Sequence, residues 1–240
     1  LSGVAGGIET SFGKARIGVA AARIGSDFAR GADTLAFDTS LFAVTARYDW
    51  DSVSLDSSAG YGSGSPDVRR VRVSGGTSET LSSQAETDLW TLAFEGTYRR
   101  MVGPVWVSPH AGASYHRARL NAWNEGRALG IQTGASSIKS LRARVGVGAS
   151  ASIGRIRPFG DLSVSTEVLH PRPEISATLI DVPDSAFTLY GEARRRTAIE
   201  SEAGLAIAIS EGLEAYVVGA MTANDVLAGR RLSAGLTFSW

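Results

Sequence analysis

Three histidines are the residues of this chain best suited to binding a metal ion or to acid–base catalysis. They are His110, His116 and His170. His110 and His116 fall on one side of an alternating segment, but six residues of extended chain separate two side chains by roughly 20 Å. One metal ion cannot be bound across that distance. The sequence therefore predicts no metal site, and no motif points to a cofactor.

A hydrolytic site would need a nucleophile, a base and an acid in one place. The polar stretch after His170 contains such residue types in Asp181, Asp184 and Ser185. No nucleophile-elbow motif and no paired-carboxylate spacing accompanies them, and surface loops are polar for other reasons. We expect that the chain is not an enzyme.

Two groups of arginines have the charge needed to bind phosphate. One contains Arg69, Arg70 and Arg72, and the other occupies residues 194–196. The formal net charge of the chain is zero, which gives no general attraction toward nucleic acid. Both groups adjoin expected loops, where contact with phosphate groups of lipids or with carboxylates of the protein is the better interpretation.

A third set of charged residues recurs on the polar side of alternating segments. The set consists of Glu95, Arg142, Arg144, Asp161, Glu167, Glu200 and Glu202. Arginines 142 and 144 come from a segment next to that of Asp161 and Glu167, so pairs between them are expected. Such charges could form a rigid polar wall, or they could contact, or even cleave, a polypeptide that passes along it. The structural role is favoured.

The elements that carry these residues are long strands. Leu141, Ala143, Val145 and the alternate residues as far as Ala151 are apolar, while Arg142, Arg144 and the residues between them are polar or small. Side chains alternate across a strand with period two. The pattern returns at residues 16–21, 42–48, 52–61, 90–99, 105–116, 161–167, 199–209 and 230–240. Several segments reach ten or more residues, the length with which a tilted strand crosses a bilayer.

The final strand carries the most specific local pattern. Residues 232–240 alternate strictly, and the chain stops at Trp240. Aromatic rings are enriched where a membrane-spanning wall meets the lipid headgroups. We therefore expect the apolar rows to face hydrocarbon, with Trp50, Trp90, Trp106 and Tyr98 in the aromatic belts.

The connections between strands alternate in length. Short turns are expected near residues 12–14, 49–51, 100–103, 153–155 and 211–212, and long links near residues 25–36, 63–83, 119–137, 171–196 and 223–227. Short turns at one rim and long loops at the other are typical of outer-membrane barrels. Eleven long strands can be counted, whereas a closed single-chain barrel needs an even number. Either a twelfth strand precedes Leu1, or residues 174–192 form an extra strand pair outside the wall.

Composition supports one large all-β domain covering residues 1–240, although two smaller domains are compatible with the length. The chain has 28 glycines and no cysteine, and no apolar run approaches the roughly 20 residues of a membrane-spanning helix. The start of the chain, from Leu1 to Thr10, also lacks the features of a signal peptide. We read it as a mature segment or an excised domain.

Five pieces of the chain resemble, in order, the translocator (β-) domain of autotransporters, the type V secretion systems of Gram-negative bacteria. Residues 6–28 are similar to its opening hairpin, residues 95–125 to its central hairpin, and residues 158–170 to a proline-led strand that ends in a carboxylate. Residues 179–196 resemble the segment that leads into the last three strands. The ending fits the signal read by the barrel-assembly machinery, on Ser233, Gly235, Phe238 and Trp240.

The resemblance implies a transmembrane antiparallel up-and-down β-barrel of twelve strands, with the first strand and a plug helix missing from this chain. Twelve strands would leave a lumen of about 10–12 Å, enough for a helix or an extended hairpin. The implied function is anchoring in the outer membrane and export of an N-terminal passenger. Implied partners are membrane lipid, lipopolysaccharide, the barrel-assembly machinery and the passenger segment, with the barrel itself monomeric.

Two other functions remain open at this point. A small outer-membrane channel or adhesin would share the wall but not the export role. A water-soluble β-barrel that binds a ligand would instead pack Val145, Val147, Leu205 and Ile207 in a dry core. Alternation alone does not say which face is wet.

Overall fold

The computed structural model describes residues 2–31, 33–74, 77–126, 130–169, 174–182, 184–190, 197–223 and 228–238. His170, the arginines of residues 194–196 and Trp240, all singled out above, lie outside these residues.

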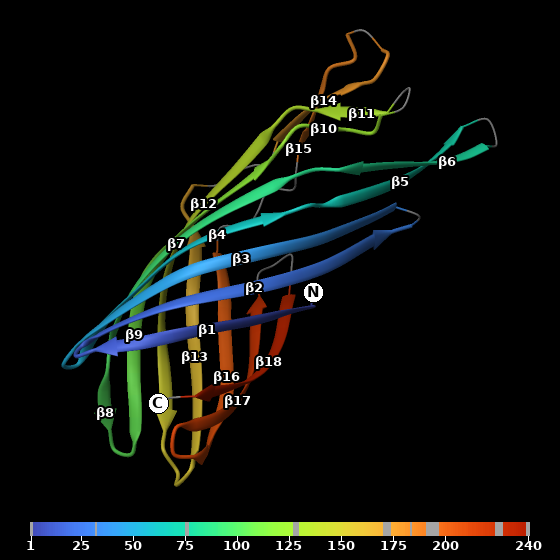
Figure 1. The fold of residues 1–240 in the computed structure, drawn as a ribbon. Helices are drawn as coiled ribbons and strands as arrows, with labels where there is room; N and C mark the ends of the chain where they lie inside the picture. The colour runs from blue at the N-terminus through green and yellow to red at the C-terminus, as the bar shows by residue number, and fades with distance from the viewer. Residues whose placement is uncertain are drawn as a thin grey trace.

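Eleven antiparallel strands form one curled sheet in which each strand pairs with the next wall strand along the chain (Figure 1). In order they are β1 (Ser2–Phe12), β2 (Ala15–Arg30), β3 (Asp33–Trp50), β4 (Val53–Gly64), β7 (Thr87–Tyr98), β9 (Val105–Leu120), β12 (Ser136–Ala151), β13 (Ile156–Glu167), β16 (Thr197–Ser210), β17 (Leu213–Ala223) and β18 (Ala228–Phe238). The expected eleven wall strands are therefore confirmed. None of the described residues belongs to a helix able to span a membrane.

The apolar rows lie on the outside of the curl. Val145 and Val147 are 60% and 44% exposed, and Ile207 is also exposed. Serine and glutamate side chains are buried on the opposite face, among them Ser163, Ser165 and Glu167. A soluble β-barrel would have the reverse arrangement, so the dry apolar core that this alternative requires is not formed by the described residues.

One aromatic residue breaks the expected pattern. Trp50, Trp90 and Tyr98 are exposed on the outer face, as a membrane belt requires. Trp106 was expected with them, but it lies on the inner row that also contains His110, with the Arg99 guanidinium 5.1 Å from its ring centre. The expectation was wrong because the strand alternation places Val105 and Val107, not Trp106, toward the outside.

The two rims of the sheet differ, as expected. At one rim the connections are tight turns, and each contains a residue with positive φ: Gly13, Asp51, Gly103, Gly154 and Gly212. β8 (Arg100–Val102) is a short addition to one of them. At the other rim the connections between β4 and β7, between β9 and β12, and between β13 and β16 are long and contain strands of their own, whereas β2 ends at Arg30 and β3 begins at Asp33.

These long connections extend the structure beyond this rim, and we call them the outer layer. β5 (Asp67–Ser74) and β6 (Thr77–Gln84) make a projecting hairpin, and β10 (Trp123–Asn124), β11 (Ile131–Thr133), β14 (Glu174–Leu179) and β15 (Phe187–Tyr190) make a second sheet (Figure 1). The strand pair that one of the two alternatives placed within residues 174–192 is thus present outside the wall. Residues 25–36, expected as a loop, instead extend β2 and β3, because their backbones stay paired as far as Arg30 and Asp33.

Glu125 joins the hairpin to the second sheet. Its side chain is only 2% exposed and accepts two hydrogen bonds from Arg70, at 2.7 and 3.2 Å. It also accepts the backbone N–H of Ile131 at 2.7 Å. The arginine group of residues 69–72 is therefore used largely for pairing with carboxylates of the protein.

We expect Glu125→Ala to release the projecting hairpin, because Arg70 loses its two charge-assisted hydrogen bonds. Trypsin added to intact cells should then cleave the hairpin at least about tenfold faster. The control is Asp67→Ala, which removes only an exposed 3.5 Å pair with Arg69. Equal cleavage of the two variants would show that Glu125 does not hold the outer layer together.

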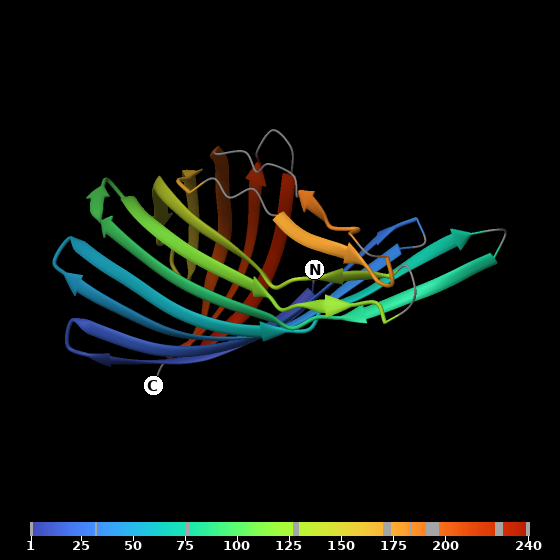
Figure 2. The same ribbon diagram turned by 90° about the horizontal axis from the view of Figure 1, so that it is seen from above.

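The sheet has two edges. In the described part of the chain β1 pairs only with β2, and β18 pairs only with β17. A cavity of 910 Å³ lies between the edges and is lined by residues of both, including Ile8, Glu9, Leu236 and Phe238. Seen from above, the wall strands follow a strongly curved path (Figure 2).

Candidate functional site

The seven charged residues singled out in the sequence all lie on the inner face of the sheet. Glu95 is on β7, Arg142 and Arg144 are on β12, Asp161 and Glu167 are on β13, and Glu200 and Glu202 are on β16. We call this set the charged wall. It occupies adjacent strands because β7, β9, β12, β13 and β16 pair in this order.

Arg144 is the centre of the charged wall. Its guanidinium donates to Asp161 at 2.7 Å and to Ser163 Oγ at 2.9 Å. Two further carboxylates, Glu95 and Glu200, each lie 3.8 Å away. One cation is therefore shared by acidic groups from three other strands, which ties a curved part of the wall together.

Two glycines make these long-range contacts possible. Gly112 lies between Glu95 and Arg144 in the cross-strand row, and a Cβ on it would be 3.1 Å from both Cα and Cβ of Glu95. Gly146 has the same role for His110, whose Nδ1 reaches Asp161 two strands away at 3.5 Å. A Cβ on Gly146 would lie 2.6 Å from His110 Nε2. Because glycine has no side chain, polar groups on the two flanking strands can contact each other across the strand that lies between them.

The partners of Arg142 and Glu167 differ from the expected ones. Arg144 pairs with Asp161 as expected, but Arg142 faces Glu200 at 3.5 Å instead of Glu167. Glu167 is buried and accepts hydrogen bonds from Ser140 Oγ at 2.5 Å and from the backbone N–H of Leu141 at 2.9 Å. The sequence did not predict that the Ser140 hydroxyl and the Leu141 N–H would be the donors to Glu167.

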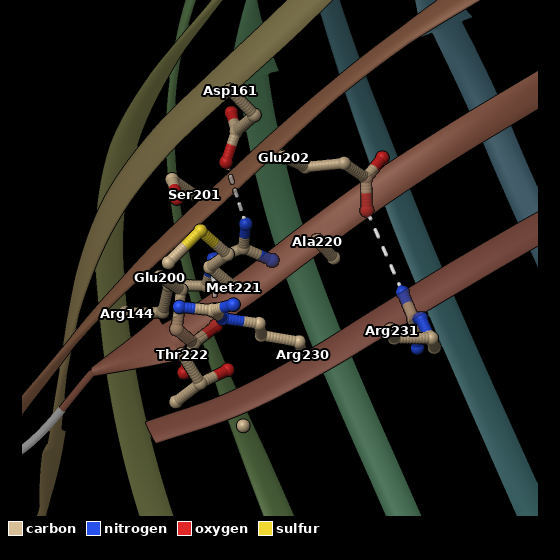
Figure 3. A pocket seen from close by; sticks show the side chains of 11 residues that line it. Arg144, Asp161, Glu200, Ser201, Glu202, Ala220, Met221, Thr222, Arg230 and Arg231 are labelled. Atoms are coloured by element: carbon tan, nitrogen blue, oxygen red, sulfur yellow. Dashed lines mark hydrogen bonds and ion pairs between the residues drawn. The ribbon is translucent and has the colours of Figure 1, made fainter.

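A cavity of 310 Å³ lies beside the charged wall, between β16, β17 and β18 (Figure 3). Its lining contains Arg231, whose guanidinium is 3.5 Å from Glu202, and also Arg230. Arg231 lies on the inner row of β18, opposite Ala220. Its role was missed because the sequence pattern of the last strand was interpreted only through its apolar side.

A second inner cluster lies on β2, β3 and β4. Arg16 and Arg47 donate to Asp49 at 3.0 and 2.9 Å, and Arg47 also approaches Asp56 at 3.3 Å. Asp49 was assigned to a turn, but β3 continues to Trp50 and directs the Asp49 side chain inward. The inner face consequently carries charges of both signs over most of its width.

The two histidines that the structure describes, His110 and His116, have separate partners. His110 Nδ1 faces Asp161 and the Ser108 carbonyl, whereas His116 Nε2 contacts Ser114 Oγ at 3.2 Å. Within the residues that the structure describes, no group of three His, Cys, Asp or Glu side chains is arranged to bind a metal. Asp181, Asp184 and Ser185 belong to the outer layer, where the Ser185 hydroxyl accepts the Leu179 N–H.

The last strand places its pattern residues on both faces. Ser233 and Gly235 lie on the inner row, and Phe238 is exposed on the outer face. Tyr216 of β17 covers Gly235, so that a Cβ at this position would overlap the Tyr216 ring and hydroxyl. Packing against Tyr216 therefore explains why position 235 is glycine, in addition to any recognition role.

Comparison with known proteins agrees with this architecture. Residues 1–219 match the family described as Autotransporter beta-domain. No curated protein sequence matches the chain. The structure is similar to the translocator domain of autotransporter NalP from Neisseria meningitidis, with a TM-score of 0.82 and 14% identity over 98% of this chain and 79% of that one.

Two further solved structures show the same fold. The beta domain of the Bordetella autotransporter BrkA has a TM-score of 0.67 and 16% identity, over 99% of this chain and 90% of that one. The transport unit of the autotransporter AIDA-I from Escherichia coli has a TM-score of 0.60 and 14% identity, over 99% and 81%. The antiparallel wall with an apolar exterior and a polar interior is thus that of a transmembrane β-barrel. The chain belongs to the autotransporter beta-domain family and is an integral outer-membrane translocator for a passenger domain.

Proposed function

We propose that the passenger segment moves along the charged wall during export and contacts it directly. The observation that supports this is the ion-pair network around Arg144, where one cation faces Asp161, Glu95 and Glu200 at 2.7–3.8 Å. These side chains are only partly buried, and Arg144, Asp161 and Glu200 border a 310 Å³ cavity. A wall of hydrated charges held in ion pairs presents a polar surface that does not retain a passing chain through apolar contact.

The proposal extends to the organisation of the domain and to its other partners. We propose that residues 1–240 act as one domain, monomeric in the membrane and without catalytic activity. Membrane lipid and lipopolysaccharide contact the outer apolar rows. The barrel-assembly machinery recognises the last strand through Ser233, Gly235, Phe238 and Trp240.

Site-specific disulfide trapping tests the passenger contact, and the absence of native cysteine makes it clean. Ser58 lies on the inner row and borders a cavity with Arg47 and Glu95, while its neighbour Ala59 is exposed on the outer face. With one cysteine in the passenger segment next to the domain, Ser58→Cys should cross-link during export and Ala59→Cys should not. Export without any cross-link at Ser58 or at other inner positions would refute the proposed path.

A further inference from the structure

The outer face carries a row of aromatic and cationic side chains near the rim with the long loops. Backbone pairing places Tyr61 of β4, Trp90 of β7, Arg117 of β9 and Lys139 of β12 directly beside one another. Arg119 follows Arg117 two residues farther toward the rim. Trp90 is 56% exposed and its ring lies 4.9 Å from that of Tyr61.

Arg117 and Lys139 are like charges on directly opposed positions, an arrangement that is unfavourable unless an anion is nearby. In the described part of the chain, the side chains of Arg117, Lys139 and Arg119 form neither an ion pair nor a hydrogen bond. All three are exposed. The closest acidic group in the pairing pattern is Asp88, opposite Arg119, and its carboxylate accepts the Tyr61 hydroxyl at 2.7 Å. A second acid, Glu86, accepts from the Asn121 side chain.

An apolar groove begins one step toward the membrane centre. The next residues along the same strands are Ala59, Leu92, Tyr115 and Leu141, and all four line a cavity of 480 Å³. Two residues of strand cover roughly 7 Å, so the groove starts close below the cations. Small side chains such as Ala113 form its floor, and Phe94 borders it.

This row lies at headgroup height. Trp90 and Tyr98 mark the two ends of the apolar surface on β7. They are eight residues or about 26 Å apart along the strand, which is about 20 Å along the membrane normal for a strand tilted by about 40°. An outer-membrane barrel has an apolar band about 25 Å tall between two aromatic girdles, and its long loops are extracellular. Trp90 and the three cations therefore border the outer leaflet.

We propose that Arg117, Lys139 and Arg119 bind the phosphates of lipid A, the phosphorylated glycolipid anchor of lipopolysaccharide, while one of its acyl chains occupies the groove. The site rests on the proposed contact with lipopolysaccharide and locates it on β7, β9 and β12. A phosphate between Arg117 and Lys139 would satisfy two opposed donors at once. Trp90 and Tyr61 would flank the sugar at the membrane interface.

Lipid binding to the full-length protein, passenger included, extracted from outer membranes into detergent, tests the site. Native mass spectrometry with bis-phosphorylated lipid A should show a bound lipid, and the double variant Arg117→Gln/Lys139→Gln should bind at least about tenfold more weakly. The matched control is Arg100→Gln/Arg155→Gln, which removes the same charge from exposed positions at the opposite rim. A lipid A with a single phosphate should bind the native protein more weakly.

Several outcomes would overturn the proposal. Unchanged lipid A binding in Arg117→Gln/Lys139→Gln would do so, and so would equal binding of phosphatidylglycerol, which would mark a general anionic interface. Binding of inorganic phosphate alone with the same affinity would remove the role of the groove. Heat-modifiable migration verifies that each variant is folded. Passenger export is measured separately, so failure of lipid binding with normal export rejects this site and leaves the translocator function intact.

Discussion

Gly146→Ala is expected to destabilise the folded barrel by about 1–3 kcal/mol, as overpacking of a filled site does. A Cβ at this position would lie 2.5 Å from Ser163 Cβ and 2.6 Å from His110 Nε2, closer than side chains can approach. The methyl group would also separate His110 from Asp161. The measurement is the temperature at which the heat-modifiable, folded form is lost on a detergent gel.

The matched control is two residues along the same strand. A Cβ on Gly148 would lie 3.4 Å from Asp161 Oδ2 and 3.6 Å from the Gly160 carbonyl, which is ordinary contact. Gly148→Ala should therefore leave the transition temperature nearly unchanged. If the two variants have the same transition temperature, the space at Gly146, where His110 approaches Asp161 across β12, is not tightly packed.

Arg144→Met should have the second large effect, because Asp161, Glu95 and Glu200 would then face one another without their shared cation. We expect a loss of about 2 kcal/mol, between the values for exposed and for buried ion pairs. Adding Asp161→Asn should recover part of the loss, since the repulsion falls with each charge removed. Thermal unfolding of the refolded protein in detergent measures both variants.

The stability loss in Arg144→Met is compared with that in Arg157→Met, which removes an exposed ion pair. Arg157 donates to Glu214 at 2.7 Å, but half of its side chain is exposed, and among the residues that the structure describes no further carboxylate is within ion-pair distance. Its removal should cost less than about 1 kcal/mol. A similar loss from Arg157→Met and Arg144→Met would mean that the shared position of Arg144 adds nothing.

The period-two pattern of the sequence predicts the wall well because every residue of a long strand has only two possible faces. Leu141, Val145 and Val147 alternate with Arg142 and Arg144, and this fixes the strand and divides its side chains between two faces. The exposure of Val145 and Val147 in the structure then shows that the apolar row is on the outside. The same rule shows that Trp106 faces inward. That error arose from interpreting an aromatic residue by its type and not by its position.

Side-chain partners were less predictable. Pairing Arg144 with Asp161 needs only neighbouring strands, whereas the contact of Arg144 with Glu95 crosses β9 at Gly112. The contact depends on register between three strands, which no local pattern contains. The hydrogen bonds between Arg70 and Glu125 likewise join residues 55 positions apart, and the second sheet pairs Ile131 with Leu179, which is 48 positions away.

The connectivity of the wall also determines how it can fold. Each wall strand between β1 and β18 pairs with the wall strand before it and the wall strand after it, so almost every contact within the wall is between neighbours along the chain. Such a sheet can grow one hairpin at a time at low entropic cost, whereas bringing the edge at β1 toward the edge at β18 requires segments more than 200 residues apart to meet. The rate-limiting event of assembly should therefore be closure at this seam, and changes near Ile8 or Phe238 should slow it far more than changes within the central hairpins.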